Sequence, residues 1–252
     1  GLLNIQFAIK DEELFILEAN PRASRTMPFV AKVTGNQIIK AGTLLMLGYS
    51  IDEVRNKTKY LSSSSNKVAI KKAIFPWSRF PAEDTMLGPE MKATGEVLGV
   101  GKEFGTALNK AYAAAGVEIN NKEKGIFVTL SDSEKPNFIQ TVNKYLELGF
   151  TLYSTEGTGK FLETNGIDSV IVGKADDLGQ TSLTIIEDKL VSLVINTPTY
   201  ANELSDGWKI RRLSHETGVA VVSSVREADA FIEAFLNQNL VLDDLEVIQD
   251  VS

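Results

Sequence analysis

The chain has 252 residues, of which 43% are hydrophobic and 23% charged, and its formal net charge is −7. This composition is typical of a globular protein with one or two domains, and the acidic balance gives no overall attraction to nucleic acid or anionic membranes. Cysteine is absent and His215 is the single histidine, which excludes disulfides, thiolate catalysis and multi-histidine metal sites. No apolar run approaches the roughly 20 residues that span a bilayer, so we expect a soluble, cytoplasmic protein.

The chain starts at Gly1 and enters an apolar stretch at once, which indicates the C-terminal piece of a longer protein. Apolar and polar residues alternate over residues 4–10 and 14–18 on either side of a turn at 11–13. This pattern predicts a β-hairpin with one buried face. An apolar segment at 38–47, followed by Gly48, predicts a short helix.

The next part of the chain is less regular. Residues 57–66 are polar and predict an exposed loop, and residues 68–75 predict a strand. We expect an irregular passage rich in proline and glycine over 76–101, and a tight surface turn at the glycines of 99–105. A helix from Phe104 to Gly116 and a charged linker at 118–124 follow.

After this linker, short apolar segments alternate with amphipathic helical patterns. The alternation predicts a Rossmann-like parallel sheet with helices on both faces. The helix near residue 136 has a proline suited to its first turn, and Asp206 and Gly218 are candidate caps of a later helix. The tail after residue 239 is acidic with scattered apolar residues. The expected strands cover residues 126–130, 150–154, 169–172, 190–195 and 219–223.

Several polar residues follow the expected strands, where loops lead into helices. In parallel sheets these loops meet at the carboxyl edge, which is where ligands bind. Thr155 and Thr158 flank Gly157 in one loop, and the following helix N-terminus offers N–H groups to a phosphate. An ordinary strand-to-helix turn with a threonine cap is the alternative for this loop alone. The same edge should carry Lys135, Lys174, Asn196 and Thr197, a local anion site in an acidic chain.

The first half contains a second polar cluster. Glu18 and Asn20 are two residues apart and share one side of an extended strand, and Gln6 lies on the expected partner strand. Such oxygen ligands suit Mg²⁺ or Mn²⁺. Arg22 and Arg25 follow in one loop and could hold a phosphoryl group or carboxylate through forked hydrogen bonds. A polar strand end with surface arginines is the alternative.

Nucleophiles and general bases are sparse in the second half. His215 falls off the apolar face set by Ile210 and Leu213, so we expect an exposed helix residue. The second half therefore has the character of a ligand-binding domain rather than a catalytic one.

The strings NIQFAI, LEANPRASRTMPFVAKVTG and FPAEDTMLGPEMKATGEVLGVGKEF resemble the C-terminal quarter of the carbamoyl-phosphate synthetase large subunit. The resemblance covers essentially the whole chain. It implies the α+β end of an ATP-grasp domain with its connecting segment over 1–117. A methylglyoxal-synthase-like regulatory domain with an α/β fold would then cover 118–252.

The resemblance also implies roles for individual residues. Gln6, Glu18 and Asn20 match the family's ligands for Mg²⁺ or Mn²⁺ with ATP, and Arg22 and Arg25 match arginines near the transferred phosphoryl group. The effector pocket is matched by Lys135, Thr155, Gly157, Thr158, Lys174, Asn196 and Thr197. Two features depart from the family pattern, Pro198 after Thr197 and the acidic Glu156 in the phosphate loop, and they leave the effector's identity open.

The family makes carbamoyl phosphate from bicarbonate, ATP and glutamine-derived ammonia, for pyrimidine and arginine biosynthesis. The resemblance therefore implies a glutaminase small subunit as partner and UMP, IMP or phosphoribosyl pyrophosphate as effector. We expect no synthetase activity from these 252 residues alone, because phosphoryl transfer also needs a nucleotide cradle. A stand-alone nucleotide-binding module and an enzyme like methylglyoxal synthase are the alternatives.

Overall fold

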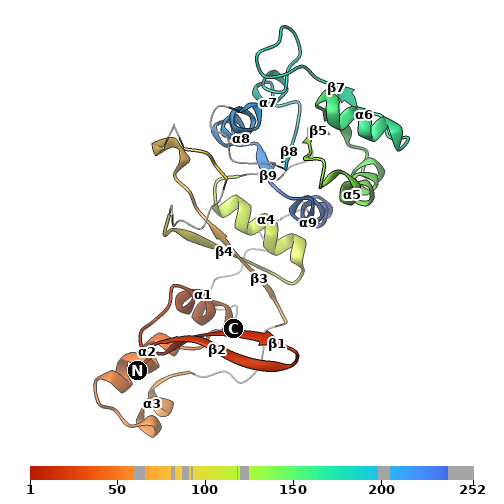
Figure 1. Ribbon diagram of the computed structural model, residues 1–252. Coiled ribbons are helices and arrows are strands. Elements are labelled where there is room, and N and C mark those ends of the chain that lie inside the picture. Colours follow the sequence, from red (N-terminus) through yellow and green to blue (C-terminus); the bar gives the residue numbers. More distant parts are fainter. Residues whose placement is uncertain are drawn as a thin grey trace. The chain divides into compact units, whose positions relative to one another are not determined.

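The computed structural model describes residues 1–59, 66–80, 83–86, 91, 93–117, 119, 125–197 and 205–237. The chain divides into two compact units, Gly1–Lys67 and Val68–Asn239 (Figure 1). Among the described residues, none of the helices has the length and apolar character required to cross a bilayer.

The first unit begins with an antiparallel hairpin of β1 (Asn4–Lys10) and β2 (Glu13–Asn20). Asp11 and Glu12 have positive φ angles of 51° and 66°, the conformation that a two-residue turn needs to match the strand twist. The expectation of a buried hairpin face is wrong, since Ile9 is 76% exposed and Ile16 66% exposed. Within the part of this unit that the structure describes, β1 and β2 pair only with each other, and most of their large apolar side chains stay exposed.

Three helices complete the described part of this unit: α1 (Thr26–Thr34), α2 (Ile38–Met46) and α3 (Ile51–Lys57). α2 lies where the apolar pattern predicted it, and Gly48 follows it with a φ of 93°. The sequence reading missed α1 and α3. A capping box starts α3, in which the Ser50 hydroxyl accepts from the N–H of Glu53 and the Glu53 carboxylate accepts from the N–H of Ser50.

The second unit opens with β3 (Val68–Ala73), the single-turn helix η1 (Trp77–Arg79), β4 (Glu96–Gly101) and α4 (Phe104–Ala114). β3 and β4 form an antiparallel pair. The predicted surface turn is therefore wrong, because Gly99 and Gly101 are buried strand residues. A Cβ atom on Gly99 would lie 2.1 Å from the carbonyl oxygen of Ala107, so glycine is required where α4 packs directly on the strand.

The predicted parallel sheet is confirmed. It consists of β5 (Gly125–Thr129), β6 (Thr151–Ser154), β7 (Val170–Ile171), β8 (Leu193–Asn196) and β9 (Ala220–Val222), in the order β7-β6-β5-β8-β9. All four strand pairings are parallel. Every residue of β8 is buried, as expected for a strand covered on both faces.

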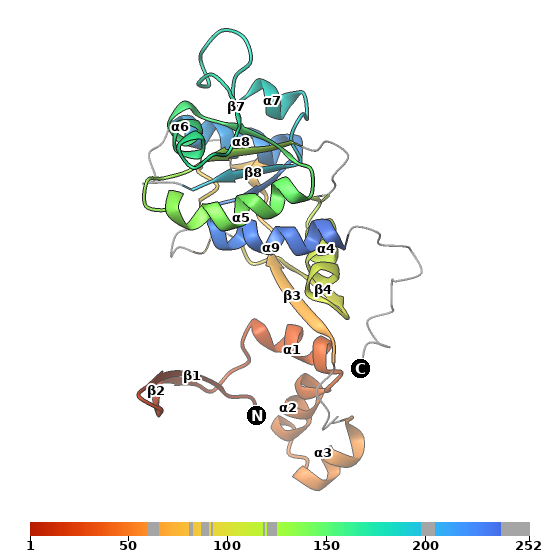
Figure 2. The same cartoon turned by 90° about the vertical axis from the view of Figure 1, so that its right-hand side faces the viewer.

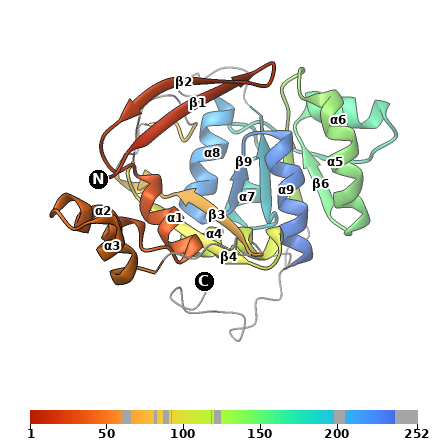
Figure 3. The same ribbon diagram turned by 90° about the horizontal axis from the view of Figure 1, so that it is seen from below.

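Helices cover both faces of this sheet (Figures 2 and 3). The hydrophobic cluster on one face includes Phe138, Leu162 and Phe231 from α5 (Lys135–Glu147), α6 (Glu156–Thr164) and α9 (Val225–Leu236). The cluster on the other face includes Ile186 and Ile210 from α7 (Thr184–Glu187) and α8 (Asp206–Thr217). The sheet thus separates two apolar cores.

The predicted helix caps are confirmed in part. Pro136 lies in the first turn of α5 and Gly218 ends α8 with a φ of 76°. The cap of α8 is Ser205 rather than Asp206, because the Ser205 hydroxyl accepts from the N–H of Trp208 at 3.2 Å.

The proposed domain boundary at 117/118 stays a prediction. α4, which precedes it, packs on α9, and Asn109 donates to the carbonyl of Ala234 at 2.8 Å. Most of the expected linker at 118–124, much of the loop at 57–66 and the tail after 239 lie outside the described residues.

Candidate functional site

The strand order places a topological switch point at β5. The chain passes from β5 to β6 on one side and later enters β8 on the other side of β5. The helices on the two sides of this point therefore lie on opposite faces of the sheet. In sheets of this kind, ligands bind at the carboxyl ends of the strands beside the switch point. The predicted anion-binding residues follow β5, β6, β7 and β8, so the fold brings their backbones to this one edge.

Threonine hydroxyls join the ends of β5 and β6. Thr158 is 2% exposed and its hydroxyl oxygen accepts from the N–H of Leu130 at 3.0 Å. The hydroxyl of Thr155 lies 3.3 Å from that of Thr158 and 3.4 Å from that of Thr129. The two predicted threonines therefore lie together against the end of β5, and Thr158 fixes the position of the first turn of α6.

A second hydroxyl contact joins β5 to β8. The side-chain oxygen of Thr197 accepts from the N–H of Ser131 at 2.8 Å, and the N–H of Thr197 donates to the carbonyl of Thr129 at 3.0 Å. Both side chains are buried, with Thr197 5% and Ser131 8% exposed. The sequence reading missed Ser131, although its place directly after a buried strand could have indicated it.

The start of α6 has the backbone expected of an anion-binding turn. Thr155 is the N-cap residue but makes no side-chain capping bond, so the first N–H groups of α6 lack that partner. A Cβ atom on Gly157 would meet no atom within 4 Å, and φ at this glycine is not positive. Neither local space nor backbone strain requires glycine at 157. Because glycine has no side chain, it leaves the N-terminus of α6 open to the approach of an anion.

Lys174 follows β7 and lies close to this turn. The pKa of the Glu156 carboxyl is held below its usual value, first by the hydrogen bond from Lys160 at 2.7 Å and additionally by the positive charge of Lys174. The N–H of Lys174 donates to the carboxylate of Asp177 at 2.7 Å, while its side chain is exposed. An ammonium group is thus available at the edge that carries Gly157.

Lys135 is the first residue of α5 and is already paired. Its ammonium lies 2.6 Å from the carboxylate of Asp132, and its side chain is 17% exposed. The hydrogen bond from Lys135 lowers the pKa of the Asp132 carboxyl. A ligand phosphate would therefore share or replace Asp132 as the partner of this lysine.

Asn196, at the end of β8, is buried and held by a residue that the sequence reading missed. The guanidinium of Arg211 on α8 donates to the side-chain oxygen of Asn196 at 2.6 Å and to both carboxylate oxygens of Asp84 at 3.0 and 2.5 Å. Arg211 is 3% exposed. Its position in a charged helical run gave no sign of burial.

The expectation that His215 is exposed is wrong. Its ring centroid lies 5.8 Å from that of Trp77, and it is half-buried. Burial lowers its pKa to about 4, with further contributions from the charges of Lys72 and Arg212. His215 lies in the last turn of α8, eight residues after Gly207, which is ~12 Å along a helix at 1.5 Å per residue.

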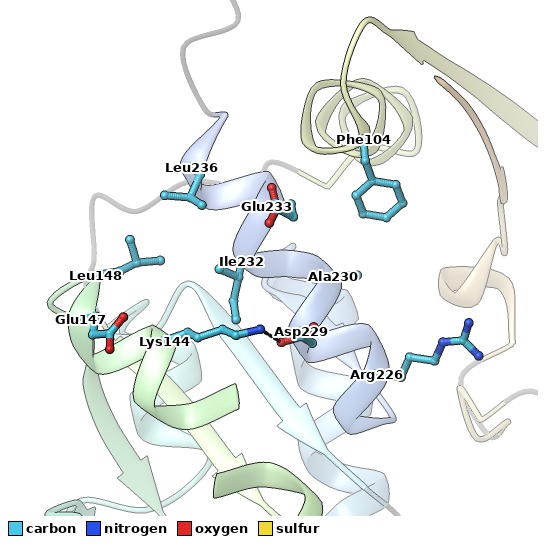
Figure 4. Close-up of a pocket in the computed structure, with 10 residues that line it drawn as sticks. All are labelled: Phe104, Lys144, Glu147, Leu148, Arg226, Asp229, Ala230, Ile232, Glu233 and Leu236. Carbon is cyan, nitrogen blue, oxygen red and sulfur yellow. Dashed lines mark hydrogen bonds and ion pairs between the residues drawn. The ribbon is translucent and has the colours of Figure 1, made fainter. Parts of the chain in front are cut away.

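A groove of about 590 Å³ lies elsewhere in the second unit, between α4, α5 and α9 (Figure 4). Lys144 and Asp229 form an ion pair of 2.6 Å across it, and Phe104 and Leu236 contribute apolar surface. None of the predicted site residues lines this groove. It is therefore separate from the candidate anion site.

In the first unit the three predicted metal ligands lie together on the hairpin. Gln6 is the register partner of Glu18, and the amide nitrogen of Asn20 donates to the Glu18 carboxylate at 2.9 Å. One carboxylate and two amides suit a divalent cation whose remaining ligands are phosphate or water. No cluster of three or more histidines or acidic residues able to hold a metal occurs among the described residues.

The two predicted arginines follow this cluster along the chain. Arg22 donates to the carbonyl of Ala23 at 3.1 Å, and its own N–H donates to the carbonyl of Asn20 at 2.8 Å. Arg25 is the N-cap residue of α1. The turn that connects β2 to α1 thus carries both guanidinium groups.

Comparisons with known proteins identify relatives for both ends of the chain. Residues 137–223 match the family described as MGS-like domain, and residues 1–54 match the carbamoyl-phosphate synthase L chain, ATP binding domain. The chain is 38% identical over 93% of its length to the "Carbamoyl phosphate synthase large chain, C-terminal section" of Methanocaldococcus jannaschii and 37% identical over 93% to that of Aquifex aeolicus. It is 41% identical over 93% to the large chain of Brucella suis biovar 1.

These alignments cover only part of the relatives. The chain spans 39% of the Methanocaldococcus protein, 46% of the Aquifex protein and 21% of the Brucella protein. The resemblance inferred from the sequence is confirmed, with an ATP-grasp end followed by an MGS-like domain.

Proposed function

We propose, on the premise that this chain corresponds to the C-terminal section of carbamoyl phosphate synthase large chains, that its second unit binds a phosphorylated effector. The site would be the carboxyl edge of the parallel sheet. UMP, IMP and phosphoribosyl pyrophosphate are the candidates. Each carries a phosphate group that a helix N-terminus and lysines can hold.

The observation that carries this proposal is the glycine at the start of α6. Gly157 has open space at its Cβ position and a backbone that other residues adopt, so neither packing nor strain explains it. Its neighbours are the hydroxyls of Thr155 and Thr158 and the ammonium of Lys174, which acts on Glu156 in the same turn. Donors and positive charge around an unobstructed helix N-terminus favour a phosphate.

We propose that the first unit forms the C-terminal part of the active site that makes carbamoyl phosphate. Gln6, Glu18 and Asn20 would hold Mg²⁺ or Mn²⁺, which would bridge nucleotide phosphates, and Arg22 and Arg25 would contact the transferred group. The contact of Asn20 with Glu18 and the register of Gln6 support this grouping. The parent protein would then be an ATP-dependent ligase that uses bicarbonate and glutamine-derived ammonia.

The remaining expectations belong to this same proposal. They are a glutaminase small subunit as partner, a cytoplasmic location, a role in pyrimidine and arginine biosynthesis, and no synthetase activity from the 252 residues alone. The last of these is tested by assaying the chain for carbamoyl phosphate with ATP, bicarbonate and ammonia. Formation of product by the chain would contradict it.

The alternative of an enzyme like methylglyoxal synthase needs a histidine within the phosphate site. His215 lies in the last turn of α8 against Trp77, while the candidate edge lies at the first turn of that helix. This placement favours ligand binding over sugar-phosphate catalysis in the second unit.

Isothermal titration calorimetry of the chain with UMP, IMP and phosphoribosyl pyrophosphate tests the proposal. We expect at least one to bind and unphosphorylated uridine to fail, because the phosphate is the group that the edge holds. Equal binding of UMP and uridine, or no binding of any of the three phosphorylated compounds, would contradict the proposal.

A further inference from the structure

Arg211 connects two side chains that are far apart in sequence. From α8 its guanidinium reaches Asn196 at the end of β8 through Nη1, and Asp84 through Nε and Nη2. Arg211 is 3% exposed and the Asp84 side chain 12% exposed. The pairing with Asp84 is bidentate, which fixes the plane of the guanidinium as well as its position.

This contact determines which way the carboxamide of Asn196 faces. A guanidinium has donors and no acceptor, so only the oxygen of Asn196 can face Arg211 at 2.6 Å. The amide nitrogen must then face away from Arg211. At the carboxyl edge of the sheet, Asn196 is therefore oriented as a hydrogen-bond donor, which suits an oxygen of an anionic ligand.

Gly207, in the first turn of α8, packs against the same pair. A Cβ atom there would lie 3.1 Å from Nη1 of Arg211 and 3.5 Å from the amide nitrogen of Asn196. A side chain at 207 would therefore press on the Arg211 guanidinium and touch Asn196 at ordinary contact distance. The orientation of Asn196 thus depends on three surrounding residues: Arg211, Asp84 and Gly207.

The adjacent Arg212 offers an internal comparison. It is also buried, at 7% exposure, and it donates to the carbonyl oxygens of Phe80 and Trp77 at 2.8 and 2.9 Å. Both arginines therefore attach α8 to the segment around residues 77–84. Of the two arginines, only Arg211 donates a hydrogen bond to Asn196 within the described part of the chain.

We propose that Arg211, held by Asp84, is a positioning residue that fixes Asn196 as a donor to the phosphorylated effector. This inference rests on the proposed effector site and extends it to residues outside the ligand's own contacts. Replacement of Arg211 by a side chain that can also accept a hydrogen bond would let the Asn196 amide turn. The turned amide would present its oxygen to the anion.

The test measures the affinity of three variants of the 252-residue chain: Arg211→Gln, Arg211→Lys and Arg212→Gln. The probes are UMP, IMP and phosphoribosyl pyrophosphate, and uridine is the unphosphorylated reference. Glutamine can donate or accept, whereas lysine, like arginine, can only donate. We expect Arg211→Gln to weaken binding of the phosphorylated probes at least about tenfold, and Arg211→Lys to restore part of that loss. Arg212→Gln should lower thermal stability similarly while changing affinity less than about twofold.

Two milder variants keep the test decisive if Arg211→Gln does not fold. Asp84→Asn removes the charge that orients the guanidinium, and Gly207→Ala presses on the Arg211 guanidinium, through which Asn196 is held. Both variants should weaken phosphate binding. Failure of the wild-type chain to bind any phosphorylated probe would overturn the proposed function itself. Wild-type binding with unchanged affinity in the Arg211, Asp84 and Gly207 variants would overturn only the positioning role.

Discussion

The hydroxyl oxygen of Thr158 accepts a hydrogen bond from the backbone N–H of Leu130 at 3.0 Å, in a position where Thr158 is 2% exposed. This bond joins the first turn of α6 to the end of β5. The helix N-terminus that would bind phosphate is therefore held by a side chain of its own first turn.

Thr158→Val should lower the free energy of unfolding by about 1–3 kcal/mol, because it leaves the buried N–H of Leu130 without its partner. Thr158→Ser keeps the hydroxyl and is the matched control. Urea denaturation followed by circular dichroism measures both variants. Equal stability of the two would contradict a structural role for this hydrogen bond.

Gly157→Ala should leave the fold intact or stabilise it by up to about 1 kcal/mol, since alanine is the better helix former and the space at Cβ is open. Binding of UMP, IMP or phosphoribosyl pyrophosphate should nevertheless weaken, because the new methyl group would obstruct the approach of a phosphate to the helix N-terminus. Thermal denaturation and calorimetry separate the two effects. An alanine variant that binds as tightly as wild type would remove the main support for the site.

Lys135→Ala and Lys174→Ala should each weaken binding of the phosphorylated probes. Under the proposed function, the double variant of the full-length protein should lose its nucleotide response while keeping its basal rate. Lys144→Ala is the control, because Lys144 lies on the same helix as Lys135 and also pairs with an aspartate at 2.6 Å. Calorimetry at low and high salt measures the charge contribution, which screening should reduce. Equal effects at Lys135 and Lys144 would argue against the assigned edge.

His215 should make the protein less stable as the pH falls. Burial lowers its pKa to about 4 from 6.5, so the folded chain holds it neutral where the unfolded chain binds a proton. Keeping His215 neutral costs the free energy of unfolding nothing above pH 6.5. As the pH falls from 6.5 to 4, the free energy of unfolding decreases by on the order of 3 kcal/mol in total. Denaturant unfolding of wild type and His215→Gln across this range should show a flatter pH profile for the variant. Parallel profiles would contradict the burial of a neutral histidine.

Glu18→Gln should weaken Mn²⁺ binding to the hairpin, because it removes the carboxylate from the Gln6, Glu18 and Asn20 group. Electron paramagnetic resonance of free Mn²⁺, titrated with protein, measures the affinity. Glu13→Gln is the control, since Glu13 lies at the other end of the same strand. Loss of binding in both variants alike would indicate a general effect of negative charge.

The parallel sheet was predictable because its strands are apolar runs separated by amphipathic helices. β8 shows why this works: a strand buried on both faces has no polar alternation that could disguise it. The convergence of Thr158, Lys174 and Thr197 on one edge followed from the sheet topology alone. Their positions needed no knowledge of individual side-chain contacts.

Other features depended on contacts that no local pattern contains. Arg211 and Asp84 are 127 residues apart, and the burial of His215 comes from Trp77 on another segment. β4 was missed because Gly99 and Gly101 resemble a turn in composition, whereas their selection reflects the close approach of α4. In each case the deciding partner lies outside the window in which periodicity is read.

The sequence has two tryptophans. Trp208 lies in α8 near its start, and Trp77, from η1, packs near the end of α8. Trp208 belongs to its first turn, directly after Gly207, and the Trp77 ring lies against His215 in its last turn. Intrinsic fluorescence therefore reports on both ends of this helix without any added label. Occupancy beside Asn196 should shift the emission of Trp208, whereas protonation of His215 should quench that of Trp77, so single-tryptophan variants can follow the two events independently.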